Sequence, residues 1–463
     1  MSFISLQFLV FFMVVTLSYY LLQNQRMRIG LLLLASCYFY MSFVPAYILI
    51  LGGIIVIDYT AGLKIAASSG KSRKSWLIVS IVANLTILIF FKYYNFLLGI
   101  FEPLVHGISP GSDMPFLSIL LPIGLSFHTF QAMSYTIEVY RGKQQPEKDF
   151  LTYALYVMFY PQLVAGPIER PGHFLPQLHQ FQQYDRKAIR EGLSRMLWGS
   201  FKKVVIADRL AMMVDYCYNH DSTLSSASLI VGAIFYSFQI YCDFSGYCDI
   251  GIGAARVMGI RLIENFNEPY RSRSMSEFWT RWHISLSTWF RDYVYIPLGG
   301  NRLGESRRKL NVFFVFLLSG LWHGANWTFL IWGGLYGLLT AFFPGNKRNN
   351  DNRSLLRSCF STLINFSIVT LLWVFFRSPS VGESFHYLHR IFRWTGGPFN
   401  VGLNINEVWA SVLLIAIMLF REYFIKSYFI KSSMTYASYF AAMVIVCYML
   451  GVFNENQFIY FQF

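Results

Sequence analysis

Residues 3–22 read F-I-S-L-Q-F-L-V-F-F-M-V-V-T-L-S-Y-Y-L-L. An apolar run of about 20 residues is long enough to cross the hydrocarbon core of a bilayer as one helix. No Lys or Arg precedes the run, and it is longer than the apolar core of a secretory signal peptide. We therefore expect a retained transmembrane helix at residues 3–22 and not a cleaved leader.

Apolar stretches of spanning length recur along the rest of the chain. They lie near residues 29–43, 46–63, 75–100, 116–140, 150–167, 225–241, 309–325, 327–344, 356–376, 405–421 and 434–452. Only 13% of the 463 residues are charged and 55% are hydrophobic, whereas a soluble domain carries about 25% charged residues. This composition excludes a soluble enzyme and predicts an all-α polytopic membrane protein.

Two segments do not fit simple spans. Residues 184–216 are amphipathic and basic, which is typical of a helix at the membrane interface. Residues 242–300 are too polar to span, so we expect them to pack against other helices or to line a cavity. With no long soluble insertion, we predict a single membrane domain: N-terminal helices at 1–167, a core at 184–345 and C-terminal helices at 355–463.

The net charge of +14 comes mostly from Lys and Arg in loops between the predicted spans. The clusters are Arg26 and Arg28; Lys64, Lys71, Arg73 and Lys74; Arg141, Lys143 and Lys148; Arg302, Arg307, Arg308 and Lys309; Lys347, Arg348, Arg353 and Arg357; and Arg421, Lys426 and Lys431. The early clusters lie in every second loop between the predicted spans, and the intervening loop at residues 102–115 carries neither Lys nor Arg. The positive-inside rule then places both termini outside the cytoplasm, although Arg390 and Arg393 fall in a loop placed outside. We expect contacts with membrane lipids and no nucleic-acid partner.

Ionisable residues at membrane depth are costly and are therefore candidates for function. They are densest between residues 241 and 328. His323 lies in L-W-H-G-A-N-W-T (321–328), where Trp322 and Trp327 could exclude water around it. A neutral imidazole can take a proton from a hydroxyl or a thiol, which is the role of a general base. The alternative is a buried histidine that is hydrogen-bonded to a carbonyl.

His283 is the second candidate, in R-W-H-I-S-L-S-T-W-F-R-D-Y (281–293). On a helix it would share a face with Ser287, close to Trp282. It could orient a substrate or support His323, or it could belong to a polar network that holds a re-entrant helix.

Two carboxylates in the same region, Asp243 and Asp249 in Y-C-D-F-S-G-Y-C-D (241–249), need partners if they are buried. Arg281 and Arg291 are candidate partners, and structural ion pairing is favoured over catalysis for both carboxylates. His386 and His389 form an H-x-x-H pair without suitable acidic or Cys ligands, so we expect no metal site.

The sequence resembles the membrane-bound O-acyltransferase (MBOAT) family. The resemblance rests on L-W-H-G-A-N-W-T, R-W-H-I-S-L-S-T-W-F-R-D-Y, D-F-S-G-Y (243–247), N-F-N-E-P-Y (265–270), G-G-N-R (299–302), L-P-I-G-L-S-F (121–127), V-A-G-P-I-E-R (164–170) and F-K-K-V-V-I-A-D (201–208). These motifs match best the bacterial branch that O-acetylates alginate, with relatives that act on peptidoglycan and cellulose and, more distantly, the teichoic acid D-alanyl transfer protein.

The resemblance implies about 11–13 transmembrane or re-entrant helices around a central tunnel, in the bacterial inner membrane. It implies that His323 and His283 are catalytic. It also implies that acetyl-CoA is the donor, with no permanently bound cofactor, and that basic loop residues hold the donor's phosphates. Residues implicated as tunnel or substrate contacts are Trp322, Asn326, Trp327, Trp282, Ser287, Asp243, Asp249, Arg281, Arg291 and Arg302.

The ending Q-F-I-Y-F-Q-F (457–463) resembles a C-terminal motif of the same branch, in which a tyrosine carries the acyl group. Tyr460 is the matching residue, and the alternative is an aromatic anchor at the interface. Because the chain has no hydrolase-type block, the resemblance implies a separate extracytoplasmic SGNH-type partner and indirect delivery to a polysaccharide. A lipid or protein O-acyltransferase of the same family, or a transporter without chemistry, are the competing functions.

Overall fold

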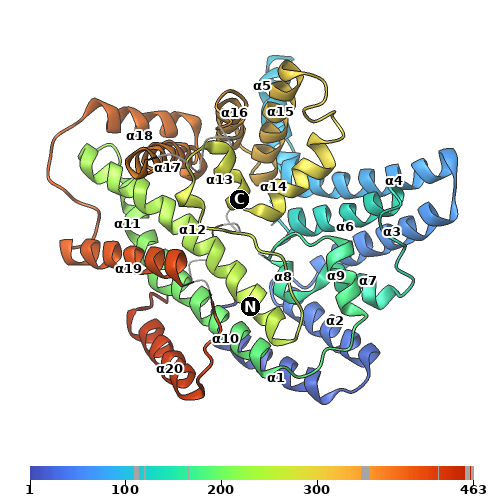
Figure 1. Cartoon of the computed structure of the whole chain (residues 1–463). Coiled ribbons are helices and arrows are strands. Elements are labelled where there is room, and N and C mark those ends of the chain that lie inside the picture. The colour runs from blue at the N-terminus through green and yellow to red at the C-terminus, as the bar shows by residue number, and fades with distance from the viewer. Residues whose placement is uncertain are drawn as a thin grey trace. The chain divides into compact units, whose positions relative to one another are not determined.

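A computed structural model describes residues 1–108, 114–118, 121–164, 166–345, 354–425, 427–453 and 459 (Figure 1). Every regular element in these ranges is a helix, which confirms the all-α prediction. The chain divides into two compact units: Met1–Gly192 with Gly251–Ile263, and Leu193–Ile250 with Glu264–Phe463. One boundary falls inside helix α10 (Arg186–Ser200), one inside helix α12 (Ser226–Val257) and one in the segment that follows α12.

The first unit contains α1 (Leu6–Leu21), α2 (Gln25–Met41), α3 (Tyr47–Ala67), α4 (Gly70–Leu88), the π-helix η1 (Ile89–Tyr93), α5 (Tyr94–Ile108), α6 (Leu125–Tyr140), α7 (Phe150–Met158), α8 (Tyr160–Leu163) and α9 (Pro171–Leu178). A buried polar cluster joins α3 to α4, where Ser80 Oγ and Asn84 Nδ2 donate to the two carboxylate oxygens of Asp58 at 2.6 and 2.8 Å. Such hydrogen bonds are needed because a carboxylate buried between membrane helices has no water to donate hydrogen bonds to it.

The second unit contains most of α10 (Arg186–Ser200) and α12 (Ser226–Val257). It also holds the π-helix η2 (Phe201–Ala207), α11 (Asp208–Asn219), the 3-10 turn η3 (Pro269–Arg271), α13 (Met275–Arg281), α14 (Ile284–Phe290), the π-helix η4 (Arg291–Tyr295), α15 (Glu305–His323), α16 (Trp327–Phe342), α17 (Leu355–Arg377), α18 (Val381–Arg393), α19 (Ile405–Phe424) and α20 (Ser433–Leu450). The stretch at 242–300, predicted as too polar to span, holds the end of α12, then η3, the short helices α13 and α14, and η4.

Each predicted apolar stretch contains a helix, but several boundaries were wrong, and the stretch at 150–167 is divided into the short helices α7 and α8. The stretch at 116–140 becomes helical only at Leu125. The stretch at 225–241 continues as α12 to Val257, because its polar residues are buried against protein and because small residues let another helix approach. A Cβ on Gly246 would lie 2.8 Å from the carbonyl oxygen of Gly199 in α10.

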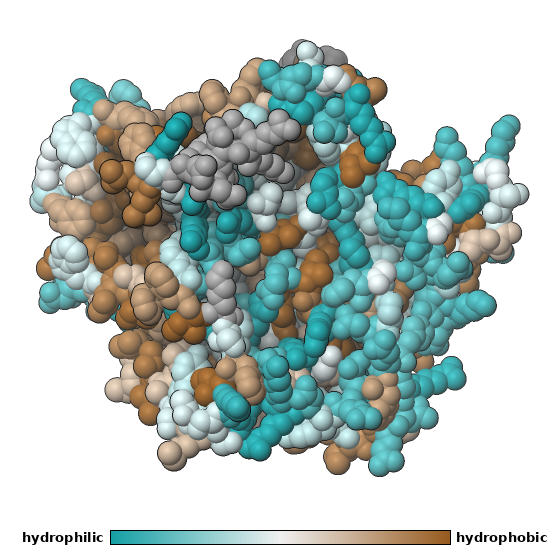
Figure 2. Space-filling model, viewed as in Figure 1, coloured by the Kyte–Doolittle hydropathy of each residue, from teal (hydrophilic) through white to brown (hydrophobic). Residues whose placement is uncertain are grey.

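Apolar side chains also cover outer surfaces of the molecule. Trp409, Leu413 and Ile417 of α19 follow one another at helical spacing and are exposed, and Figure 2 shows hydrophobic surface over this helix. Among the described residues, five helical stretches are long and apolar enough to cross a membrane. They are Tyr47–Ala67, Gly70–His106, Ser226–Val257, Leu355–Arg377 and Ser433–Leu450. The composition, these helices and the exposed apolar faces identify a multi-pass membrane protein.

Candidate active site

His323 is the last residue of α15, at the tight junction with α16. A Cβ on Gly320 would lie 2.2 Å from the carbonyl oxygen of Phe329, and one on Gly333 would lie 2.4 Å from that of Phe316. No side chain fits at either glycine, so α15 and α16 pack backbone against backbone. Gly324 ends α15 and is similarly crowded by the ring of Phe329. This close packing fixes where the imidazole of His323 lies.

Aromatic rings surround the imidazole of His323, which is only 3% exposed. The ring centroids of Trp322, Trp332 and Phe376 lie 5.0, 5.1 and 5.3 Å from it. Trp327, which the sequence places near His323, begins α16 and is 53% exposed. Trp332, on the next part of the same helix, encloses the imidazole instead.

His283 lies beside His323, with the two ring centroids 6.4 Å apart. It is fully buried and precedes the first residue of α14 with φ +45°, in the left-handed region that non-glycine residues rarely adopt. His283 lies outside the helices long and apolar enough to span a membrane. Its burial lowers the pKa of the imidazole to about 3, so the ring is neutral at physiological pH. The structure therefore brings together the two histidines that the sequence analysis selected.

Asn265 was not selected from the sequence, yet it holds His283 and α14 in place. Its Oδ1 lies 3.1 Å from His283 Nδ1 and accepts from the Ser285 backbone N–H at 3.1 Å and the Ser285 hydroxyl at 2.9 Å. Its backbone oxygen accepts from the Ile284 N–H at 2.9 Å. The one signal in the sequence is that Asn265 opens the motif N-F-N-E-P-Y.

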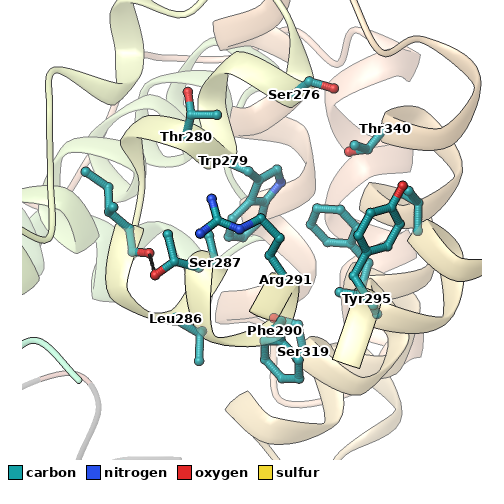
Figure 3. Close-up of a pocket in the computed structure, with 15 residues that line it drawn as sticks. Ser276, Trp279, Thr280, Leu286, Ser287, Phe290, Arg291, Tyr295, Ser319 and Thr340 are labelled. Carbon is teal, nitrogen blue, oxygen red and sulfur yellow. Dashed lines mark hydrogen bonds between the residues drawn. The ribbon is translucent and has the colours of Figure 1, made fainter. Parts of the chain in front are cut away.

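A cavity of about 430 Å³ is lined by residues of α13, α14, η4, α15 and α16, and neither His323 nor His283 is among them (Figure 3). It is lined by Ser276, Trp279, Thr280, Ile284, Leu286, Ser287, Thr288, Phe290, Arg291, Tyr295, Val312, Val315, Phe316, Ser319 and Thr340. Its lining is mostly apolar, and Ser319 lies one helical turn before His323. Figure 3 shows Trp279, Ser287 and Arg291 among the residues that line this space. Two predicted tunnel residues, Ser287 and Arg291, are among the lining residues.

The two buried aspartates are paired with basic residues of α10 and η2. Asp249 contacts Lys202 at 2.7 Å and Arg195 at 2.8 Å, and Asp243 contacts Lys203 at 2.6 Å. The candidate partners suggested by the sequence were wrong. Arg281 pairs with Glu277 at 3.0 Å on its own helix, and Arg291 pairs with the adjacent Asp292 at 2.8 Å.

The segment F-K-K-V-V-I-A-D explains this difference. Residues Phe201–Ala207 form η2 and are all buried, so the predicted interfacial position of 184–216 was wrong for this part. Lys202 and Lys203 therefore enter the protein interior, where buried carboxylates neutralise them.

Asp243 also anchors the end of the chain. Its Oδ2 accepts the backbone N–H of Ile459 at 2.8 Å, and Ile459 is 5% exposed. The backbone N–H of Val452 donates to the Val204 oxygen at 2.8 Å. Tyr460, the predicted acyl carrier, lies outside the described residues.

The remaining predicted site residues have other positions. Trp282 is fully buried, with its ring stacked on Phe278 at 5.5 Å. Asn326 caps α16 by accepting from the Thr328 N–H and donates to the Pro379 oxygen at 2.9 Å. Arg302 is exposed in the loop before α15. None of these three lines the cavity described above.

Comparison with known proteins defines the class. Residues 144–386 match the family model described as MBOAT, membrane-bound O-acyltransferase family. A probable alginate O-acetylase, AlgI, of Pseudomonas aeruginosa is 38% identical over 436 residues, covering 92% of this chain and 82% of its own length. A peptidoglycan O-acetyltransferase of Helicobacter pylori is 37% identical over 387 residues, covering 77% and 72%.

A teichoic acid D-alanyltransferase of Bacillus subtilis is more distant, at 27% identity over 289 residues, covering 58% of this chain and 70% of its own length. A helical membrane protein that matches this family model and these relatives is an acyltransferase. The chain belongs to the membrane-bound O-acyltransferase family.

Proposed function

We propose that this protein transfers an acetyl group from cytosolic acetyl-CoA, across the bacterial inner membrane, for O-acetylation of an extracytoplasmic polysaccharide. The observation that carries the proposal is the buried pair His323 and His283, 6.4 Å apart, in a chain similar to alginate and peptidoglycan O-acetyltransferases. Helices α14 and α15, which adjoin the two histidines, also line an apolar cavity. We thus propose acetyl-CoA as the donor, a polysaccharide as the acceptor and the inner membrane as the location of the protein.

In the proposed reaction His323 acts as general base. It removes the proton of an attacking hydroxyl, whose oxygen forms a bond to the thioester carbonyl carbon. The carbon–sulfur bond breaks, the CoA thiolate leaves toward the cytosol, and the proton held by His323 passes to it or to water. The aromatic rings around His323 exclude water, which protects the thioester from hydrolysis.

The cavity along α15 is the proposed path of the donor. Its apolar walls suit an uncharged pantetheine arm, whereas the anionic end of acetyl-CoA stays in the cytosol. Arg291 at the cavity and Arg302 in the exposed loop before α15 are the proposed phosphate contacts. No permanently bound cofactor is required.

Ser319 offers a test of this path, because it lines the cavity one turn before His323 and is 5% exposed. We expect Ser319→Leu to fill the end of the cavity and to lower the transfer rate by about 100-fold, since misplacing the reacting group by 1 Å has an effect of that size. Ser319→Ala leaves the space open and should keep nearly all activity. Equal rates for both variants would place the donor path elsewhere.

The proposed acceptor inside the protein is Tyr460, which would carry the acetyl group as a phenyl ester to an SGNH-type extracytoplasmic partner. With both termini outside, as the loop charges predict, Tyr460 would face that partner. The Asp243–Ile459 hydrogen bond supports the proposal because it ties the residue before Tyr460 to the interior of the same unit as His323.

The test uses purified protein in proteoliposomes and acetyl-CoA with a radiolabelled acetyl group. We expect the wild type to release CoA and to acquire label, and Tyr460→Phe to acquire none. Tyr448→Phe, which changes an exposed tyrosine of α20, is the matched control and should label normally. Normal labelling of Tyr460→Phe would refute the carrier role.

The competing functions give different results in the same assay. Label in the lipid fraction or on an added protein would indicate a lipid or protein O-acyltransferase. Uptake of intact acetyl-CoA without release of CoA would indicate a transporter.

A further inference from the structure

Asn265 is 1% exposed and contacts both the ring of His283 and the first turn of α14. We propose that Asn265 is a positioning residue that holds His283 in the tautomer protonated on Nδ1, so that Nε2 carries the lone pair used during acyl transfer. This inference rests on the proposed function, because it assigns His283 a role in that reaction.

The orientation of the Asn265 amide is fixed by its neighbours. A backbone N–H can only donate, and that of Ser285 lies 3.1 Å from Oδ1. On the other side of the amide, Nδ2 donates to the sulfur of Cys248 at 3.4 Å. A flipped amide would point its N–H groups at the Ser285 N–H, so Oδ1 is the atom that faces His283.

The tautomer of His283 follows from this orientation. Nδ1 lies 3.1 Å from Oδ1, which has only lone pairs to offer, so Nδ1 must carry the hydrogen. In a neutral imidazole the other nitrogen then carries the lone pair. Nε2 is therefore the atom of His283 that can accept a hydrogen bond within the proposed site.

The same asparagine also holds the backbone of His283. A left-handed conformation at a residue other than glycine costs about 1–3 kcal/mol and persists only where its surroundings enforce it. The Ile284 N–H donates to the Asn265 oxygen at 2.9 Å, and the Asn267 N–H donates to the Arg281 oxygen at 2.9 Å. These two hydrogen bonds hold the backbone on either side of His283. The short segment from Asn265 to Asn267 therefore positions both the ring and the backbone of His283.

The test compares Asn265→Ala and Asn265→Asp in the labelling assay across pH. Loss of the amide should lower the transfer rate by about 10- to 100-fold, as for other residues that orient a functional histidine. The carboxylate of Asn265→Asp keeps the acceptor but stabilises the imidazolium, which raises the pKa of His283. Because imidazolium has no lone pair on Nε2, the acid limb of the pH profile should move to higher pH by about 1–3 units, with activity partly recovered at high pH.

Asn311→Ala is the matched control, because Asn311 is also buried and donates to backbone oxygens, those of Leu298 and Gly300. It should lower thermal stability without moving the pH profile. If the profile of Asn265→Asp coincides with that of the wild type, or if both Asn265 variants lose only stability as the control does, the inference is wrong. If His323→Ala and His283→Ala transfer acetyl normally, the proposed function itself fails.

Discussion

Replacing His323 with Ala is expected to lower acetyl transfer by about 100- to 10,000-fold, the contribution that a general base usually makes. The reason is that the substitution removes the proposed proton acceptor from a water-excluding group of aromatic rings. Trp322, Trp332 and Phe376 provide no replacement base. The measurement is release of CoA and appearance of acetyl label in proteoliposomes, normalised to folded protein.

The matched control for this loss is His128→Ala. His128 is a buried histidine of α6, with Nε2 3.1 Å from the oxygen of Ile123, and it belongs to the first unit. It should change stability more than transfer. His323→Gln, which keeps a polar side chain of similar size, should be as inactive as His323→Ala. Full activity of either His323 variant would remove His323 from the mechanism.

Replacing Lys202 with Met is expected to cause the largest loss of stability, about 3–5 kcal/mol in the free energy of unfolding. The side chain of Lys202 is 3% exposed, and its ammonium contacts Asp249 at 2.7 Å and Glu422 at 3.3 Å. Without it, buried negative charge at Asp249 keeps only Arg195 as a partner. Denaturation of purified protein in detergent, followed by circular dichroism, measures the change.

Lys187→Met is the control for Lys202→Met, because Lys187 is 60% exposed and lies 4.0 Å from Glu191. Exposed ion pairs contribute about 0–1 kcal/mol, so this variant should unfold close to the wild type. The double variant Lys202→Met with Asp249→Asn should recover part of the stability, since both members of the pair are then neutral. A loss in Lys202→Met no larger than in the control would contradict the structural role of the pair.

The helices and the histidine pair were predictable from the sequence, for a physical reason. Apolar runs of spanning length are rare outside membranes, and a histidine among them, as at His323, is conspicuous because burying it is costly. The partners of Asp243 and Asp249 were not predictable. Lys202 and Lys203 look like interfacial charges in the sequence, and only the packing of η2 against α12 shows that they are internal.

The interpretation of the net charge changes accordingly. Arg28, assigned to a loop from the sequence, is also buried and donates to the Leu22 oxygen at 2.8 Å and to the Gln182 oxygen. Part of the +14 therefore lies in the interior of the protein, where it is hydrogen-bonded or paired, and not in exposed loops. Asn265 was missed because its role depends on a contact with residues 18 to 20 positions later in the chain, which local patterns cannot reveal.

The hydrogen bond between Asp243 and Ile459 joins residues 216 positions apart in the chain. Asp243 belongs to a helix made when about half of the chain has been synthesised, whereas Ile459 leaves the ribosome among the last of these 463 residues. The contact therefore cannot form until the 216 residues that separate its two members have been synthesised. Asp243 must remain in place within α12 during that time, so this hydrogen bond forms later in synthesis than the contacts within α12 do.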